Sequence, residues 1–244
     1  MSPRMSVVIP VLDDAPALDR CLEALARQHV PPHEVIVVDN GSSDHSVAIA
    51  RRHGARVLHE PVRGIGAAAA RGYDAATGDL IGRLDADSIP PPDWIAAMTA
   101  VAVSSGADAV TGWGYFYDAR WWYRWSASLY LACYYLLTTA AMAHAPLWGS
   151  SCVIRIEHWR RVSGEVHRWE SEVHDDMDLS FALGPQVTVV VTRRPLVGVS
   201  ARSVHGLEQW LRRLARGRRT VALAWARTPP WLRWHARYAR SAIE

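Results

Sequence analysis

The sequence predicts an α/β protein with a mostly parallel sheet, and two observations lead to this class. Short apolar runs alternate with helical patterns through the first half of the chain, as in proteins built from strand–helix–strand units. In addition, 50% of the 244 residues are hydrophobic, which is enough to form a large core and argues against wholesale disorder. A chain of this length forms one large domain or one domain with a substantial appendage.

The first half supplies the elements of this sheet in order. The run SVVIPV at residues 6–11 predicts a buried strand, and Pro16 after it suits the start of a helix. Leu18, Leu22 and Leu25 recur at the spacing of one helical face, which supports that helix. The other expected strands are residues 34–39, 55–60, 79–85 and 107–112, and the other expected helices follow Ser42-Ser43-Asp44, cover 65–76 and start at the prolines 90–92.

The second half is less regular, and one stretch of it raises the question of a membrane span. Residues 125–154 contain no Asp, Glu, Lys or Arg, and about 20 apolar residues are enough to cross a bilayer. Ser, Thr and His side chains dilute this stretch, so a buried or interfacial helix is favoured over a span.

The positive charge of the chain is concentrated at its C-terminal end. The net charge is +3, but residues 202–244 contain ten arginines against Glu208 and Glu244, so this segment carries +8 and the remainder −5. Arginine side chains bind phosphates and anionic surfaces, although a solvated helix face explains the same pattern. The three widely spaced cysteines and the lack of an N-terminal signal-like segment favour a cytoplasmic protein.

Two glycines in the middle of the first half fit two different kinds of site. Gly64, Gly66 and Ala69 match the G-x-G-x-x-A pattern of dinucleotide enzymes, and Asp85 follows about twenty residues later. That pattern belongs in the first strand-to-helix turn, and here the first such turn, PVLDDAPAL, contains no glycine. We therefore expect these glycines to allow a tight turn beside a ligand rather than to bind a dinucleotide.

Asp85 and Asp87 form a pair of carboxylates at the end of a predicted strand. Residues i and i+2 of an extended chain point to the same side, so both carboxylates can face one ligand. Mg²⁺ and Mn²⁺ suit oxygen ligands, and Mg²⁺ is usually held by one or two carboxylates together with substrate phosphates and water. The pair therefore predicts a site for a diphosphate and a metal ion, although acids at strand ends also serve as loop caps.

Three segments follow one another along the chain: VIVVDNGSSD at 35–44, RGIGAAAARGYDAATGDLIGRLDADS at 63–88 and HDDMDLSFAL at 174–183. This series resembles the family 2 glycosyltransferases of the GT-A fold, over roughly residues 5–220. The resemblance implies a mostly parallel, Rossmann-like sheet flanked by helices. The implied organisation is a GT-A domain at 1–220, with a nucleotide-binding half at 1–112 and an acceptor-binding half at 113–220, followed by a basic amphipathic helix at 221–244.

The resemblance also implies roles for individual residues. For the donor, Pro10, Val11 and Asp39 would bind the nucleoside, Gly66 and Arg71 would lie beside the diphosphate, Asp85 would bind the ribose and Asp87 the metal ion, Mg²⁺ or Mn²⁺. Asp176 would be the general base, and Asp175 would stand in place of the family's Glu. Alternatively, Asp39 is a turn residue, and the acids at 175–178 stabilise the start of a helix.

The implied reaction moves one sugar from a UDP- or GDP-linked donor to an acceptor hydroxyl. A metal ion at Asp87 would neutralise the leaving diphosphate. Asp176 on the opposite face would remove the proton of the acceptor hydroxyl. Because the hydroxyl then attacks from the face opposite the leaving group, the anomeric configuration inverts. The stretch QWLRR at 209–213 is similar to the Q-x-x-R-W element of processive members but has Arg where Trp is expected, which favours single transfer. The side chains that could contact a diphosphate or a lipid phosphate are those of Arg212, Arg213, Arg216 and His205. Alternatively, this segment is an exposed amphipathic helix.

The last segment, TPPWLRWHARYARSAIE, places Trp231, Trp234 and Tyr238 on one helical stripe among arginines. A basic helix with an aromatic stripe suits an anionic membrane surface. We therefore expect a peripheral enzyme on the inner face of the cell membrane, with a lipid, a sugar or another small molecule as acceptor and no nucleic-acid partner. Packing on the core or a protein interface explains the stripe nearly as well.

Two other functions are compatible with parts of the sequence. A sugar-nucleotide nucleotidyltransferase on a related fold would need a glycine-rich, basic loop after the first strand, and PVLDDAPAL provides none. A non-catalytic membrane-surface binding protein would not need intact acids at 85, 87 and 176. Asp87 and Asp176 must also meet in one site, so the glycosyltransferase interpretation requires that residues 125–154 between them do not cross a membrane.

Overall fold

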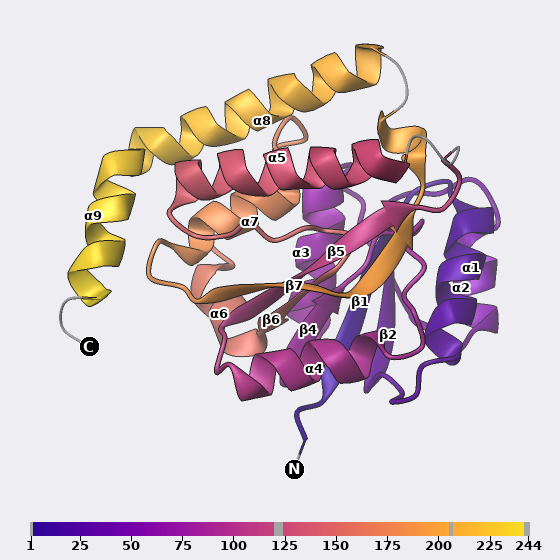
Figure 1. Cartoon of the computed structure of the whole chain (residues 1–244). Coiled ribbons are helices and arrows are strands. Elements are labelled where there is room, and N and C mark those ends of the chain that lie inside the picture. The colour runs from indigo at the N-terminus through magenta and orange to yellow at the C-terminus, as the bar shows by residue number, and fades with distance from the viewer. Residues whose placement is uncertain (1, 120–123, 205–206, 242–244) are drawn as a thin grey trace.

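The structure of the chain is a computed structural model, which describes residues 2–119, 124–204 and 207–241 (Figure 1). Its strands are β1 (Met5–Val11), β2 (Glu34–Asp39), β3 (Arg56–His59), β4 (Leu80–Arg83), β5 (Ala109–Phe116), β6 (Cys152–Arg155) and β7 (Val189–Val199). Its helices are α1 (Ala15–Ala26), α2 (Ser46–Arg52), α3 (Ile65–Ala75), α4 (Trp94–Ser104), α5 (Arg124–Met142), α6 (Ile156–Val162), α7 (Asp175–Leu183), α8 (Leu207–Arg227) and α9 (Pro230–Ser241), with a 3-10 turn at Ala201–Val204.

The strands form one seven-stranded sheet in the described part of the chain, in the order β3-β2-β1-β4-β6-β5-β7. Neighbouring strands are parallel, except that β6 runs antiparallel to β4 and β5. Every residue of β1 is buried, as expected for a central strand that helices cover on both faces. The carboxyl ends of β1, β2 and β4 meet at one edge of the sheet, which is where ligands bind in open sheets of this kind.

Helices cover both faces of the sheet. On one face, α1 and α4 pack through Leu18 and Trp94 against the apolar side chains of β1 and β4. On the other face, apolar residues of α3, α6 and α7 form a second cluster with β1 and β2. Gly72 lets α3 approach β1 closely, because a Cβ atom at this position would lie 2.3 Å from Cγ1 of Val8.

Three further helices lie outside these layers: α5 and α8 run across one end of the sheet, and α9 leaves the end of α8 at a steep angle and passes the end of α5 (Figure 1). Tyr135 fixes α5 to β5, because its hydroxyl donates to the Gly112 carbonyl at 2.6 Å and its ring stacks on Trp113. Helix α8 continues through residue 220, so the domain boundary expected there falls inside a helix. In the described part of the chain, no helix has the length and apolarity needed to cross a membrane.

The structure confirms the mostly parallel α/β sheet that the sequence predicts. The expected strands of the first half correspond to β1, β2, β3 and β4 and to the first part of β5. The sequence did not predict β6, α6 or β7. Strand β6 has four residues and passes directly into α6, so neither element is long enough to show its own periodicity.

Candidate active site

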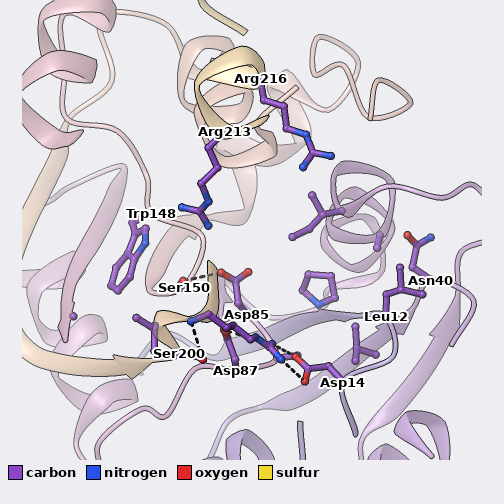
Figure 2. A pocket seen from close by; sticks show the side chains of 18 of the residues that line it. Leu12, Asp14, Asn40, Asp85, Asp87, Trp148, Ser150, Ser200, Arg213 and Arg216 are labelled. Atoms are coloured by element: carbon purple, nitrogen blue, oxygen red, sulfur yellow. Dashed lines mark hydrogen bonds and ion pairs between the residues drawn. The ribbon is translucent and has the colours of Figure 1, made fainter. Parts of the chain in front are cut away.

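Two adjoining cavities lie at the carboxyl edge of the sheet. The first, the polar cavity, has a volume of about 540 Å³ and lies at the ends of β1, β2 and β4. The second, the apolar cavity, has a volume of about 1380 Å³ and lies between α5, α7 and α8. Their shared wall contains Ile65, Asp85, Tyr130, Leu131, Trp148, Ser150, Arg213 and Arg216. Asp85 therefore stands where the two cavities meet. Figure 2 shows Asp85 among the side chains that line the polar cavity.

Hydrogen bonds fix both carboxylate oxygens of Asp85. Arg83 donates from Nη2 to Oδ1 at 2.8 Å, and the Ser150 hydroxyl donates to Oδ2 at 2.7 Å. The first donor comes from the end of β4 and the second from the loop before β6. The side chain is thus held in one orientation at the mouth of the polar cavity.

Asp87 also lines the polar cavity but has a different environment. Arg202 lies 3.4 Å from its Oδ2 and also donates to both oxygens of Asp14. Burial and the negative charge of Asp85 raise the pKa of Asp87 to about 6. The described residues contain no group of three or more His, Cys, Asp or Glu side chains placed to hold a metal ion. A divalent ion at Asp87 would therefore need ligands from phosphates and water, as Mg²⁺ commonly has.

The three acids at the start of α7 have three different sets of partners. Asp175 accepts a hydrogen bond from Arg83 Nη1 at 2.7 Å. Asp176 accepts hydrogen bonds from the Gly149 amide at 3.1 Å and from the Met177 amide at 2.8 Å. Asp178 is buried and accepts from the amide and the ring of His167, outside the lining of both cavities.

Asp176 is the acid of α7 whose environment suits proton transfer. It lines the apolar cavity and has no Arg bonded to its carboxylate among the described contacts. Burial and the adjacent charge of Asp175 raise its pKa above the ordinary value for Asp. A carboxylate with raised basicity that faces a cavity is the arrangement that general-base chemistry requires.

The nucleoside end of the predicted site is only partly as the sequence suggests. Pro10 and Val11 line the polar cavity. Asp39 is buried outside its lining; although burial opposes it, hydrogen bonds from Ser42 and His59 hold its pKa below the usual value. The next residue, Asn40, lines the cavity instead and accepts a hydrogen bond from the Gly64 amide at 2.8 Å.

The two glycines of the G-x-G stretch have separate functions. Gly64 lines the polar cavity at a φ of +146°, a backbone conformation that other residues rarely adopt. Gly66 lies beneath α7, because a Cβ atom there would come within 3.6 Å of the Asp175 Cβ. Arg71 is exposed on α3 and lies outside the lining of both cavities.

Helix α8 contributes to the site two of the three arginines that the sequence suggests for a phosphate contact, and His205 lies outside the described residues. Arg213 and Arg216 line both cavities and extend from α8 toward Asp85 (Figure 2). Arg212 is 73% exposed at its side chain and pairs with Glu208 on the outer surface of α8. Arg213 is also held by the Tyr130 hydroxyl, to which it donates at 3.1 Å.

Sequence reasoning missed Arg83, Ser150 and Arg202, which contact the acids of the site. No motif marks any of them, because most of their contacts arise only through the fold: Ser150 is 65 residues from Asp85, and Arg83 is 92 residues from Asp175 in the sequence. Asn40 could have been found, since it follows the end of a parallel strand at the ligand-binding edge.

A mostly parallel sheet with paired acids at the strand ends, and a second acidic cluster beside them, is the arrangement of an α/β enzyme whose site lies at the carboxyl edge of the sheet. Residues 6–163, more than half of the chain, match the model of the family described as glycosyl transferase family 2. The chain belongs to glycosyl transferase family 2, which confirms the family and the class of enzyme that the sequence predicts.

Curated relatives agree with this family. Glycosyltransferase AglE of Haloferax volcanii is 32% identical over 118 residues, which are 45% of this chain and 39% of the relative. Glycosyltransferase GlyG of Streptococcus pneumoniae is 34% identical over 125 residues, which are 48% of this chain and 41% of the relative. The chain spans less than half the length of these relatives.

Solved structures confirm the GT-A fold. The mannosyltransferase PcManGT from Pyrobaculum calidifontis, in complex with GDP-Man and Mn²⁺, has a TM-score of 0.68 and 19% identity over 100% of this chain and 76% of its own. Glucosyl-3-phosphoglycerate synthase from Mycobacterium tuberculosis, with Mn²⁺, UDP and glucosyl-3-phosphoglycerate, has a TM-score of 0.65 and 19% identity over 92% of this chain and 80% of its own.

Proposed function

We propose that this chain transfers one sugar, with inversion, from a UDP- or GDP-linked donor to an acceptor hydroxyl, with Asp176 as the general base and Mg²⁺ or Mn²⁺ at Asp87. One observation carries the proposal: Asp87 lines the polar cavity, Asp176 lines the apolar cavity, and the two cavities share a wall at Asp85. The ligands named for the two solved structures, GDP-Man or UDP with Mn²⁺, support the donor class and the metal.

The acids after β4 fit a divalent cation bound together with a diphosphate. Both oxygens of Asp85 already accept hydrogen bonds, whereas Asp87 keeps a raised pKa because its charge is buried beside that of Asp85. A cation next to Asp87 would relieve this repulsion. When bound, the ion would neutralise negative charge on the leaving diphosphate.

The protein side chains would carry the proton and orient the reactants. The acceptor oxygen attacks C1 of the donor sugar from the side of the apolar cavity, and the C1–O bond to the diphosphate breaks. The nucleoside diphosphate leaves with the electron pair into the polar cavity, and the acceptor proton moves to Asp176. Attack opposite the leaving group inverts the anomeric centre, and Arg213 and Arg216 supply positive charge beside the diphosphate.

Asp176→Asn tests the chemical role of Asp176. The amide oxygen of Asn still accepts a hydrogen bond but cannot take a proton, so UDP or GDP should bind with Mn²⁺ as in the wild type. Donor turnover, measured as nucleoside diphosphate released, should fall by about 10²–10⁴-fold. Asp178→Asn is the matched control, because Asp178 contacts His167 and neither cavity. Consumption of added pyrophosphate, with release of nucleoside triphosphate and sugar 1-phosphate, would instead indicate a nucleotidyltransferase. Full turnover by Asp176→Asn would remove Asp176 as the base.

The lining of the apolar cavity supports an amphiphilic, lipid-linked acceptor. Leu137 and Leu214, from α5 and α8, line this cavity and remain largely exposed. Further exposed apolar side chains lie on α5, α8 and α9: Leu129, Leu136, Leu211, Trp231, Leu232 and Tyr238. A cavity that opens beside such a surface can receive a hydrocarbon chain while the acceptor hydroxyl reaches Asp176.

The structure changes which residues of the C-terminal region would contact a membrane. Arg233 is 5% exposed and donates to the Phe181 carbonyl, and Arg237 donates to the Pro185 and Val187 carbonyls, so both point toward the domain. Trp231 and Tyr238 are exposed. We therefore assign the proposed contact with an anionic membrane to the exposed apolar residues of α5, α8 and α9 named above. Exposed arginines of α8, among them Arg212, Arg218 and Arg219, would contribute the positive charge. The location on the inner face of the cell membrane stays a prediction.

Sedimentation with vesicles of phosphatidylglycerol and phosphatidylcholine tests this contact. Wild-type protein should bind, and high salt should reduce binding because it screens the attraction between arginines and lipid headgroups. Leu136→Glu places a charge at a 71% exposed position on α5 and should reduce binding, as should truncation after Thr228. Val103→Glu, at a 54% exposed position on α4, is the matched control. Equal sedimentation of all four proteins would contradict a specific membrane face.

A further inference from the structure

Arg83, at the end of β4, connects the two acidic pairs of the site. Its guanidinium donates from Nη2 to Asp85 Oδ1 at 2.8 Å and from Nη1 to Asp175 Oδ2 at 2.7 Å. The Tyr73 hydroxyl is a third partner, at 3.1 Å. Asp85 belongs to the donor side and Asp175 lies 92 residues from Arg83, in the first turn of α7. One side chain thus links the acids after β4 to the helix that carries Asp176.

Burial of this arginine does not favour stability in itself. Arg83 is 2% exposed, and its Nε has no hydrogen-bond partner among the described residues. Burying a cation is unfavourable unless all its donors are paired, and apolar residues of similar volume often stabilise a core as well or better. The other residues of β4 are Leu80, Ile81 and Gly82, so Arg83 is the charged residue of a strand that is otherwise uncharged. A functional reason therefore accounts for Arg83 better than a structural one.

The two acidic pairs have the same arrangement around Arg83. In each pair the first acid, Asp85 or Asp175, is bonded to the guanidinium, and the second acid, Asp87 or Asp176, is not. The guanidinium is planar and holds its two partners in a fixed geometry, which an ammonium group cannot do. The separation between the donor acids and the first turn of α7 is therefore set by one rigid group.

We propose that Arg83 is a positioning residue for the transfer: it holds Asp85 at the donor and, through Asp175, holds the first turn of α7 so that Asp176 faces the reacting carbon. The inference rests on the proposed function of Asp176 as the base. It assigns different functions to the adjacent acids of α7, since Asp175 anchors the helix to the donor site and Asp176 is left free to accept a proton.

The charges around Asp176 agree with this division. Burial and Asp175 raise the pKa of Asp176, while His174, the hydrogen bond from the Gly149 amide and Arg83 act in the opposite direction. The titratable and charged groups around Asp176 on β4, β6, α5 and α7 are Arg83, Cys152, Tyr134, Tyr135, Asp175 and His174, and Arg213 and Arg216 of α8 line the same cavity. Arg83 is a permanent cation that lowers the pKa of Asp176, so its removal should raise this pKa further.

Arg83→Met and Arg83→Lys test the proposal in the full chain, with Tyr73→Phe as the matched control. Tyr73→Phe removes the third partner of Arg83 and leaves both contacts with acids. Three quantities are measured: the affinity for UDP and GDP with Mn²⁺ by calorimetry, the rate of hydrolysis of UDP- and GDP-linked hexoses, and the temperature of thermal unfolding. In the hydrolysis, water attacks C1 in place of the acceptor and Asp176 takes the proton of the water. Each measurement is repeated across pH.

Arg83→Met should weaken nucleotide binding about tenfold, because Asp85 loses a charge-assisted hydrogen bond. It should slow hydrolysis of bound donor by about 10²-fold through misplacement of Asp176, and move the acidic limb of the pH profile to higher pH. Arg83→Lys keeps the charge and should leave that limb in place, but should recover only part of the rate. Asp175→Asn should move the limb to lower pH, since it removes the charge that raises the pKa of Asp176.

If Arg83 had only a structural role, Arg83→Met would have a lower melting temperature, but its nucleotide affinity, its rate of hydrolysis per folded molecule and its pH profile would equal those of the wild type. That result would overturn the proposal. If Arg83→Met does not fold, wild-type values of all three for Arg83→Lys would overturn it equally. Failure of this proposal can be told apart from failure of the proposed base. Full turnover by Asp176→Asn would show that Asp176 is not the base. Loss of nucleotide affinity in Arg83→Met would still support the role of Arg83 in holding Asp85.

Discussion

The polar cavity and the apolar cavity meet at Asp85 but are built in different ways. The ends of strands form much of the polar cavity, and its acids are held by short hydrogen bonds and ion pairs, such as those of Asp85 and Asp14. Helices α5, α7 and α8 form the apolar cavity, and leucines on two of them remain exposed to solvent. The comparison teaches that the sheet frames the polar cavity, the proposed donor side, whereas helices packed onto the sheet form the apolar cavity, the proposed acceptor side. Changes on the two sides should therefore be separable by experiment.

The largest expected effect on the donor side is that of Asp87→Ala. Calorimetry with UDP or GDP and Mn²⁺ should show a loss of at least ~100-fold, because even outer partners of metal ligands contribute ~10–100-fold to metal affinity. Without metal, in EDTA, wild-type protein and variant should bind equally. Asp79→Ala at the opposite end of β4 is the control. Equal affinity of the wild type with Mn²⁺ and with EDTA would refute a metal site at Asp87.

The second largest expected effect is a loss of metal-dependent nucleotide affinity at acid pH. The pKa of Asp87 is raised to about 6, so the carboxylate is ionised and able to bind metal above this pH and is protonated below it. The Mn²⁺-dependent part of UDP or GDP affinity should then fall by about tenfold between pH 7 and pH 5, since one proton competes with the ion. Affinity that stays constant over this range would show that Asp87 does not titrate there.

On the acceptor side, Leu137→Glu should produce a smaller effect of a different kind. Leu137 lines the apolar cavity, and part of a leucine side chain buried by a ligand contributes roughly 1 kcal/mol. Decyl glucoside, an amphiphile with free hydroxyls, should raise the melting temperature of the wild type, and Leu137→Glu should weaken its binding about fivefold. Glucose is the control ligand and UDP with Mn²⁺ the control measurement. Two results would contradict a separate acceptor side: a higher melting temperature with glucose, or a change in UDP affinity caused by Leu137→Glu.

The sequence predicts the donor side better than the acceptor side, for a physical reason. Strands β1 and β2 are largely apolar, and β4 begins with Leu80 and Ile81. Because parallel strands bring their carboxyl ends together, Asp85 and Asp87 could be placed in a site before the structure was known. Contacts that join distant segments leave no local pattern: Arg83 meets Asp175 across 92 residues, and Ser150 meets Asp85 across 65.

The sequence also did not predict which face of a C-terminal helix packs against the domain. Periodicity shows which residues of α9 share a stripe but not which stripe packs on the domain. The sequence groups Trp231, Trp234 and Tyr238 on one outer stripe, yet Trp234 donates from Nε1 to the Ala140 carbonyl of α5 at 2.9 Å. Arg233, expected at a membrane surface, lies over the Phe181 ring with its guanidinium carbon 4.8 Å from the centroid. Packing against α5 and α7 decides the face, and those helices lie far away in the sequence.

The last expected effect is on stability rather than on ligand binding, and it separates packing from membrane contact on the proposed acceptor side. Arg233 donates to the Phe181 carbonyl in the last turn of α7 and to the Thr228 carbonyl before α9, so Arg233→Gln should cost about 1–2 kcal/mol of stability and lower the melting temperature by a few degrees. Because this side chain faces the domain, the variant should sediment with anionic vesicles as well as the wild type does and bind UDP with Mn²⁺ unchanged. Arg212→Gln is the matched variant on the outer surface, where it should leave stability within about 0.5 kcal/mol and reduce vesicle binding. The opposite pattern, with vesicle binding lost in Arg233→Gln and kept in Arg212→Gln, would mean that α9 leaves the domain to meet the membrane.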